Sequence, residues 1–204
     1  SELQGNIIDL CPVGALTSKP YAFTARPWEL QKTNTIDVMD GTGCNIRVDS
    51  KGNRVMRITP IENHFVNEEW ISDKSRFVWD GIRVQRLDTP FRKVNGKFVA
   101  TSWEDALSLA SEKLQNGSTT FVSGDLINTE ALYAARKLSE YIGGTNVIGD
   151  LDTSCRINGR SFYVGNGKIE DIDNVKNIIL LGANPRKEAS VINARIRKAW
   201  LGGA

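Results

Sequence analysis

The chain has 204 residues, 40% of them hydrophobic, which is enough to bury a core in one domain or in two small ones. Its 26 basic and 24 acidic residues leave a net charge of +2, so nothing indicates nucleic acid or an anionic membrane as a partner. No apolar run approaches the roughly 20 residues of a membrane-spanning helix, and we expect no direct membrane insertion.

Residues 1–27 form a turn-rich stretch in which Cys11-Pro12 is followed by Pro20 and Pro27. Such a stretch cannot form a core of its own, so we expect it to pack on a neighbour. The chain starts without Met and ends directly after a helical pattern. We therefore interpret it as a piece of a longer protein, incomplete at both ends.

Residues 28–100 are predicted to form a small β-rich domain. Alternating apolar residues at Ile36 and Val38 and then at Ile46 and Val48 indicate strands, and a tight turn at residues 50–53 leads to a return strand over 55–58. A second hairpin is predicted over residues 91–100, because its central Asn95-Gly96 pair tolerates the positive φ that a tight hairpin turn demands.

Residues 101–204 alternate between helix and strand patterns. Ser102 and Asp105 can form a capping box that opens the first helix. The most apolar run, Ile178–Leu181, predicts a strand buried in a parallel sheet. The expected elements are helices over 102–116, 129–142 and 188–200, and strands over 119–122, 146–148 and 178–181. The predicted fold class is therefore mixed α/β, a small β-rich domain followed by an incomplete, doubly wound parallel-sheet domain.

Three cysteines, Cys11, Cys44 and Cys155, lie far apart in the sequence. Their spacing argues against a disulfide framework and against a self-contained CxxC metal site, and it favours a reducing compartment. A lone cysteine is more often a small buried apolar residue than a ligand. The Cys11-Pro12 pair favours ligation, because iron–sulfur proteins often end a cysteine series in Cys-Pro and proline holds the thiolate in a rigid turn.

Residues 6–23, NIIDLCPVGALTSKPYAF, closely resemble the end of the ferredoxin-like domain in the large iron–sulfur subunits of respiratory complex I. The resemblance covers essentially the whole chain and continues through residues 25–29, 67–74, 101–106, 182–186 and 193–198. It implies that residues 1–27 end an iron–sulfur domain, that 28–100 form a degenerate cluster-binding domain, and that 101–204 belong to an α/β domain of molybdopterin-oxidoreductase type.

In that family Cys11 would be the fourth ligand of a [4Fe-4S] cluster between flavin and quinone, with the other ligands preceding Ser1 or on another chain. The resemblance implies an electron-transfer subunit of NADH:ubiquinone oxidoreductase that carries no catalytic residue and no molybdopterin. Its partners would be other peripheral-arm subunits, including the flavin-bearing one. We expect it at the matrix side of the mitochondrial inner membrane or, alternatively, at the cytoplasmic face of a bacterial plasma membrane.

The second stretch resembles the opening domain of molybdopterin oxidoreductases such as formate dehydrogenase, in which four cysteines hold a cluster. Alignment puts Asp37, Asp40 and Cys44 at three of these positions and Ser72 near the fourth. One thiolate, two carboxylates and a hydroxyl make a poor site for a soft metal. We therefore expect this region to be free of metal and Cys44 to pack in the core of a β-hairpin.

Two other functions stay open, a molybdopterin-dependent oxidoreductase such as formate dehydrogenase and a purely structural or assembly subunit. The loop 182–185 lies where α/β domains often bind nucleotides, but without a full GxGxxG motif a simple turn into a helix explains it as well. His64, the single histidine, is expected on the surface. A solvated or subunit-contacting face is expected for the basic residues Arg186, Lys187, Arg195, Arg197 and Lys198.

Overall fold

The computed structural model describes residues 2–82, 84, 86–116, 119–124, 126–143, 147–148, 161 and 164–204. Cys155 lies outside these residues. The chain divides into two compact units, one made of Ser1–Arg86 with Gly165–Ala204 and the other of Leu87–Val164. None of the described helices has the length and apolar character needed to cross a membrane. The domain boundaries predicted at residues 27 and 100 stay a prediction.

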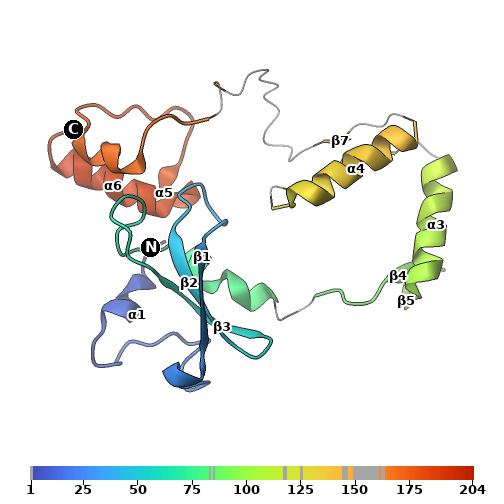
Figure 1. Ribbon diagram of the computed structural model, residues 1–204, viewed down its shortest axis with the longest axis horizontal. Helices are drawn as coiled ribbons and strands as arrows, with labels where there is room; N and C mark the ends of the chain where they lie inside the picture. Colours follow the sequence, from blue (N-terminus) through green and yellow to red (C-terminus); the bar gives the residue numbers. More distant parts are fainter. Residues whose placement is uncertain are drawn as a thin grey trace. The chain divides into compact units, whose positions relative to one another are not determined.

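The centre of the first unit is an antiparallel sheet with the strand order β1–β2–β3 (Figure 1). The strands are β1 (Gln31–Ile36), β2 (Asn45–Lys51) and β3 (Arg54–Pro60). The turn Gly52-Asn53 joins β2 to β3, and Gly52 has a φ of +57°, which glycine adopts without a steric penalty. The hairpin predicted around residues 50–53 is therefore confirmed.

Short helices complete the first unit. They are α1 (Asn6–Leu10), η1 (Pro27–Glu29), α2 (Asp73–Phe77), η2 (Val78–Ile82), η4 (Ile169–Asn174), α5 (Pro185–Glu188) and α6 (Ser190–Leu201). The chain breaks between α5 and α6 at Ala189, whose φ of −150° and ψ of 73° are not helical. The helix predicted over residues 188–200 is thus present as α6, and a separate single turn precedes it.

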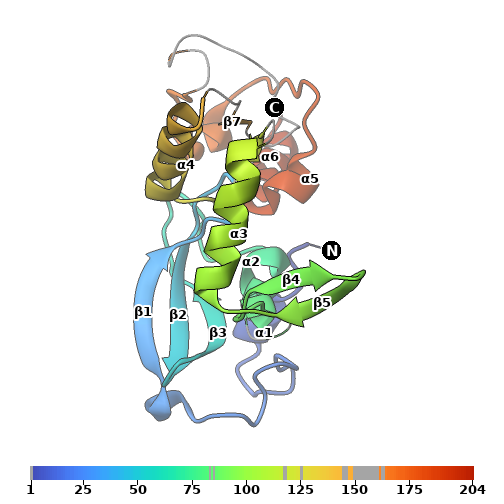
Figure 2. The same ribbon diagram turned by 90° about the vertical axis from the view of Figure 1, so that its right-hand side faces the viewer.

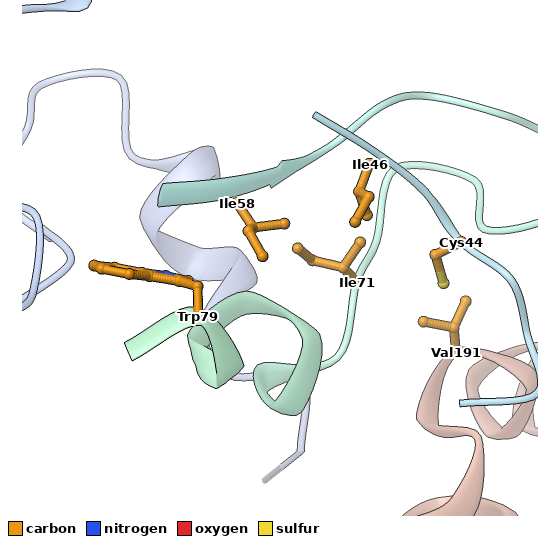
Figure 3. Packing of buried hydrophobic residues seen from close by; sticks show 6 residues of the cluster. All are labelled: Cys44, Ile46, Ile58, Ile71, Trp79 and Val191. Atoms are coloured by element: carbon orange, nitrogen blue, oxygen red, sulfur yellow. The ribbon is translucent and has the colours of Figure 1, made fainter. Parts of the chain in front are cut away.

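The core of the first unit draws on segments that are far apart in the sequence. Its buried cluster comprises Cys44, Ile46, Ile58, Ile71, Trp79 and Val191 (Figure 3). Burying a side chain of this size contributes roughly 1.5–3 kcal/mol to stability. Leu3 packs against the same cluster, so the N-terminal stretch depends on a neighbour, as expected. Val191 brings α6 into this core.

The second unit contains the second predicted hairpin, β4 (Phe91–Val94) and β5 (Lys97–Ala100), as an antiparallel pair. Asn95 has a φ of 49° and Gly96 a φ of 82°. Two successive positive φ values match the right-handed twist of the flanking strands. The prediction of this hairpin is confirmed, including its turn.

Two helices and a short parallel pair are the other elements of the second unit among the residues that the structure describes. They are α3 (Trp103–Asn116), β6 (Phe121–Val122), α4 (Thr129–Tyr141) and β7 (Val147–Ile148). Figure 2 labels α3, α4 and β7. Ser102 caps α3 as predicted, since its Oγ accepts a hydrogen bond from the Asp105 N–H at 3.1 Å. The order of helices and parallel strands confirms the mixed α/β class, with strands shorter than predicted.

The prediction of a buried strand at Ile178–Leu181 is wrong for this structure. The segment has no strand conformation, and Ile179 and Leu181 are 81% and 86% exposed. A parallel strand exists only where neighbouring strands satisfy its backbone N–H and C=O groups. No strand in the described part of the chain pairs with it. Its apolar composition alone therefore does not make it a strand.

Candidate functional site

Cys11 stands at the C-terminal end of α1, where its N–H donates to the Ile7 carbonyl at 3.1 Å. The thiol is free and partly exposed. The chain then turns through Gly14, whose φ of +67° suits glycine, and the N–H of Leu16 approaches the Cys11 sulfur at an N···S distance of 3.5 Å. The loop after Cys11 therefore presents a backbone donor to an accessible sulfur.

This loop changes the acidity of the thiol. The Leu16 N–H makes the largest contribution to a lowered pKa of Cys11, and the amides of residues 13–15 add to it against a smaller effect of burial. A lower pKa favours the thiolate, which is the form that binds iron. The lowered pKa is therefore consistent with the predicted role of Cys11 as a metal ligand. Cys11 belongs to no group of three or more potential metal ligands among the described residues.

Helix α1, which ends just before Cys11, makes hydrogen bonds to α2 and to the segment that leads into it. The side chain of Asn6 is buried, its Nδ2 donates to the Ile71 carbonyl at 2.8 Å, and its Oδ1 accepts from the Ile71 N–H at 3.1 Å. Arg76 donates to Asp9 at 2.6 Å. Sequence analysis missed these residues, because they are more than 60 positions apart and no local pattern marks them.

The three residues aligned with cluster ligands come together as the alignment implies. One ligand atom from each of Asp37, Asp40 and Cys44 lies within 4.8 Å of the others. All three belong to the connection between β1 and β2, which the Asp37 N–H closes by donating to the Cys44 carbonyl at 2.8 Å. Asp37 and Cys44 are almost fully buried. The loop therefore keeps the geometry of a small ligand cage.

Ser72, near the fourth ligand position, is connected to this cage through Ser75. The Ser72 Oγ caps α2 by accepting from the Ser75 N–H at 3.1 Å, and the two hydroxyls are 2.8 Å apart. The Ser75 hydroxyl donates to Asp37 in a short hydrogen bond. The capping position of Ser72 is the sequence signal that could have identified Ser75.

The chemistry of the cage does not fit an iron–sulfur cluster. Burial raises the pKa of Cys44 to about 12, and the charges of Asp40 and Asp37 add to this effect, so the thiol is protonated at neutral pH. Asp37 accepts hydrogen bonds on both carboxylate oxygens. A protonated thiol and two hydrogen-bonded carboxylates are poor ligands for a soft metal. Figure 3 shows Cys44 packed with apolar side chains, which confirms its predicted place in the core.

The sequence also singled out His64 and the loop 182–185 as candidates. His64 is on the surface, as expected, with its Nε2 2.8 Å from the carboxylate of Glu62. The loop 182–185 turns at Gly182, where φ is +62°, and leads directly into α5. These features agree with a turn into a helix.

The prediction that the basic residues form a solvated face is wrong for Arg195. Its side chain is only 2% exposed, and it pairs with Asp173 at 2.7 Å and donates to the Val66 carbonyl at 3.1 Å. Carboxylate and carbonyl acceptors compensate the buried charge, which removes the penalty that favours exposure. Lys198 also pairs with Asp173 at 3.3 Å, but it remains largely exposed.

Comparison with known families matches both halves of the chain. Residues 30–80 match the family described as NADH-ubiquinone oxidoreductase NDSU1/NuoG-like, 4Fe-4S domain. Residues 86–204, more than half of the chain, match the molybdopterin oxidoreductase family. The first match covers the cage of Asp37, Asp40 and Cys44.

Similar proteins cover nearly the whole chain. The NADH-ubiquinone oxidoreductase 78 kDa subunits, mitochondrial, of Candida albicans and Neurospora crassa are 51% and 49% identical to it over 98% of its length. An NADH-quinone oxidoreductase subunit of the bacterium Rickettsia conorii is 44% identical over 96%. The chain spans 28–30% of the length of these relatives. It therefore belongs to the molybdopterin oxidoreductase family and resembles the large iron–sulfur subunit of NADH:ubiquinone oxidoreductase.

Proposed function

We propose that this chain is part of an electron-transfer subunit of NADH:ubiquinone oxidoreductase, and that Cys11 is one ligand of a [4Fe-4S] cluster. The observation that carries the proposal is the accessible Cys11 thiol with the Leu16 N–H 3.5 Å from its sulfur. The names of the relatives support the enzyme. The other three ligands lie in residues that precede Ser1 in the complete subunit or on another chain.

The proposed role assigns little chemistry to the rest of the chain. A [4Fe-4S] cluster supplies a centre for reversible one-electron transfer when it is bound. Cys11 would hold one iron, and the backbone amides that follow it stabilise the negative charge of its sulfur. The remaining residues are scaffold, while NADH, flavin and quinone bind to other subunits. No molybdopterin takes part in the proposed role.

The proposed partners are the other subunits of the peripheral arm, among them the flavin-bearing subunit. The proposed location is the matrix side of the mitochondrial inner membrane, because the relatives from Candida albicans and Neurospora crassa are named as mitochondrial. The bacterial relative supports the alternative, the cytoplasmic face of a plasma membrane. Both locations share the reducing environment that a free Cys11 requires.

The proposal is tested by Cys11→Ala in the assembled complex. Removing one thiolate leaves an iron without its protein ligand, so we expect the cluster to be lost or converted to a three-iron form. Quinone reduction should then fall steeply, because a serial path has no bypass. NADH oxidation by an artificial acceptor at the flavin, upstream of this step, should persist. EPR spectroscopy and the two activity assays measure these effects.

Cys44→Ala is the matched control, because it removes a thiol that the structure places in the apolar core. We expect it to cost about 1–3 kcal/mol of stability and to leave the cluster signal intact. If the Cys11 variant assembles with an unchanged cluster spectrum and full quinone reductase activity, Cys11 is not a ligand and the proposed function of this chain is wrong.

A further inference from the structure

Helix α1, which ends at Cys11, is too short to hold its own position. It has five residues, and Ile7 and Leu10 are 45% and 58% exposed, so it buries little apolar surface. Isolated helices of this length are not stable in water. The orientation of Cys11 at the end of α1 is therefore fixed by the contacts that other elements make with α1.

Those contacts converge on the start of α1. The Gly5 N–H donates to the Asp73 carboxylate at 2.6 Å, and the Asp73 N–H donates to the Glu2 carbonyl at 2.8 Å. Asn6 and Ile71 exchange two hydrogen bonds, with the Asn6 amide acting as donor and acceptor. The segment from Glu2 to Asn6, which leads into α1, is thus tied to residues 71–73 by four hydrogen bonds.

Arg76 of α2 extends this connection along the whole of α1. Its side chain is 5% exposed, and its Nη2 donates both to the Asn6 Oδ1 at 3.0 Å and to the Asp9 carboxylate at 2.6 Å. Asp9 is two residues before Cys11. One guanidinium therefore bridges the start of α1 to its last turn. A Cβ added to Gly5 would lie 2.7 Å from the Arg76 Cδ, so no larger residue fits there unchanged.

The same helix α2 is anchored to the degenerate cage. Ser72 caps α2, and Ser75 donates to Asp37, so the start of α2 is held by the loop that a cluster would occupy in related enzymes. Both serines are buried. The cage therefore fixes α2, and α2 in turn fixes α1.

We infer that Ile71, Asp73 and Arg76 form a clamp that positions Cys11 for iron ligation, with Arg76 as its central positioning residue. This inference rests on the proposed function of Cys11. The clamp gives the cage of Asp37, Asp40 and Cys44 a structural role, because it connects the cage, through α2, to a ligand in the neighbouring segment. Residues that orient a ligand from behind affect metal affinity without touching the metal.

The test uses Arg76→Gln in the assembled complex. Glutamine cannot bridge Asn6 and Asp9 together, so we expect a broadened EPR signal of the cluster and about tenfold faster loss of its iron to a chelator. Arg76→Lys, which can still reach Asp9, should restore part of both properties. Gly5→Ala provides a second variant that disturbs the clamp without altering Arg76.

Arg195→Gln is the matched control, because Arg195 is also buried and paired, but its hydrogen bonds go to Val66, His64 and Asp173 and not to α1. It should lower stability and leave the EPR signal and iron loss unchanged. If it reproduces the effect of Arg76→Gln, or if Arg76→Gln and Gly5→Ala both leave signal and iron loss unchanged, the clamp is refuted. Cys11→Ala decides the proposed function independently, since a cluster that depends on Cys11 but not on Arg76 refutes only the clamp.

Discussion

Cys11 and Cys44 carry the same thiol group, but their surroundings shift its pKa in opposite directions. At Cys11, backbone N–H groups surround an accessible sulfur and lower the pKa. At Cys44, burial and two nearby carboxylates raise the pKa to about 12. The sequence predicted the contrast in part, because Cys11-Pro12 marks a rigid turn and Cys44 adjoins a strand. It could not predict the hydrogen bonds from Ser75 to Asp37 and from Arg76 to α1, which depend on segments brought together by folding.

The raised pKa of Cys44 predicts a pH dependence of stability. In the unfolded chain the thiol titrates near its ordinary value of about 8.5, whereas in the folded chain it stays protonated up to about pH 12. Between these values the unfolded state loses the proton first, so stability is full below the lower value and falls as pH rises. We expect a loss on the order of 1 kcal/mol per pH unit in this window.

Urea unfolding of the chain and of Cys44→Ala at pH 8 and pH 10.5 measures this effect, because other titrating groups are common to both proteins. The stability advantage of the unaltered chain over Cys44→Ala should shrink at the higher pH. An advantage that stays constant would mean that Cys44 titrates normally in the folded state.

At the scale of elements, the features that could be predicted are those set by neighbouring residues. The Asn95-Gly96 turn and the Ser102 cap follow local rules and are present. The failures have long-range causes. Ile178–Leu181 requires strands beside it to become a strand, and Arg195 is buried because Asp173 and distant carbonyls surround it. Periodicity and charge in one segment contain no information about such partners.

The cap of α4 gives a test at this scale. The Asn128 side chain accepts from the Ala131 N–H at 2.7 Å and satisfies one of the free donors at the start of the helix. Asn128→Ala should destabilise α4 by about 1 kcal/mol, while Asn128→Ser should retain most of the cap. Hydrogen exchange of the first amides of α4 measures the change. Equal protection in the alanine and serine variants would contradict a role for this cap.

At the scale of the whole molecule, residues from both ends of the chain build one compact unit. Arg186 pairs with Glu2 at 2.9 Å. Val191 of α6 packs in the same core as Cys44 (Figure 3). The two family matches follow one another in the sequence, at residues 30–80 and 86–204. Nevertheless, residues 165–204, which belong to the second match, pack with residues 1–86. The sequence analysis could not predict this packing, because no local pattern in a helix indicates which core it will join.

The loop between β1 and β2 brings potential ligand atoms together, and whether it can hold a cluster can be tested by adding thiols. Three ligand atoms already lie within 4.8 Å, and Ser72 is linked to Asp37 through Ser75. The unaltered region should bind no iron, because its thiol is protonated and its carboxylates are hard ligands. The variant Asp37→Cys, Asp40→Cys, Ser72→Cys supplies four thiols with Cys44, and removal of both carboxylate charges lowers the pKa of Cys44.

We expect this triple variant to gain about four irons per chain after reconstitution, with a new EPR signal on reduction. The matched variant Asp37→Ser, Asp40→Ser removes the same charges without adding thiols and should bind none. Iron and sulfide analysis measures both. A triple variant that folds but takes up no iron would show that the loop between β1 and β2 no longer has the geometry of a cluster site, and that hydrogen bonding through Ser75 has reshaped it.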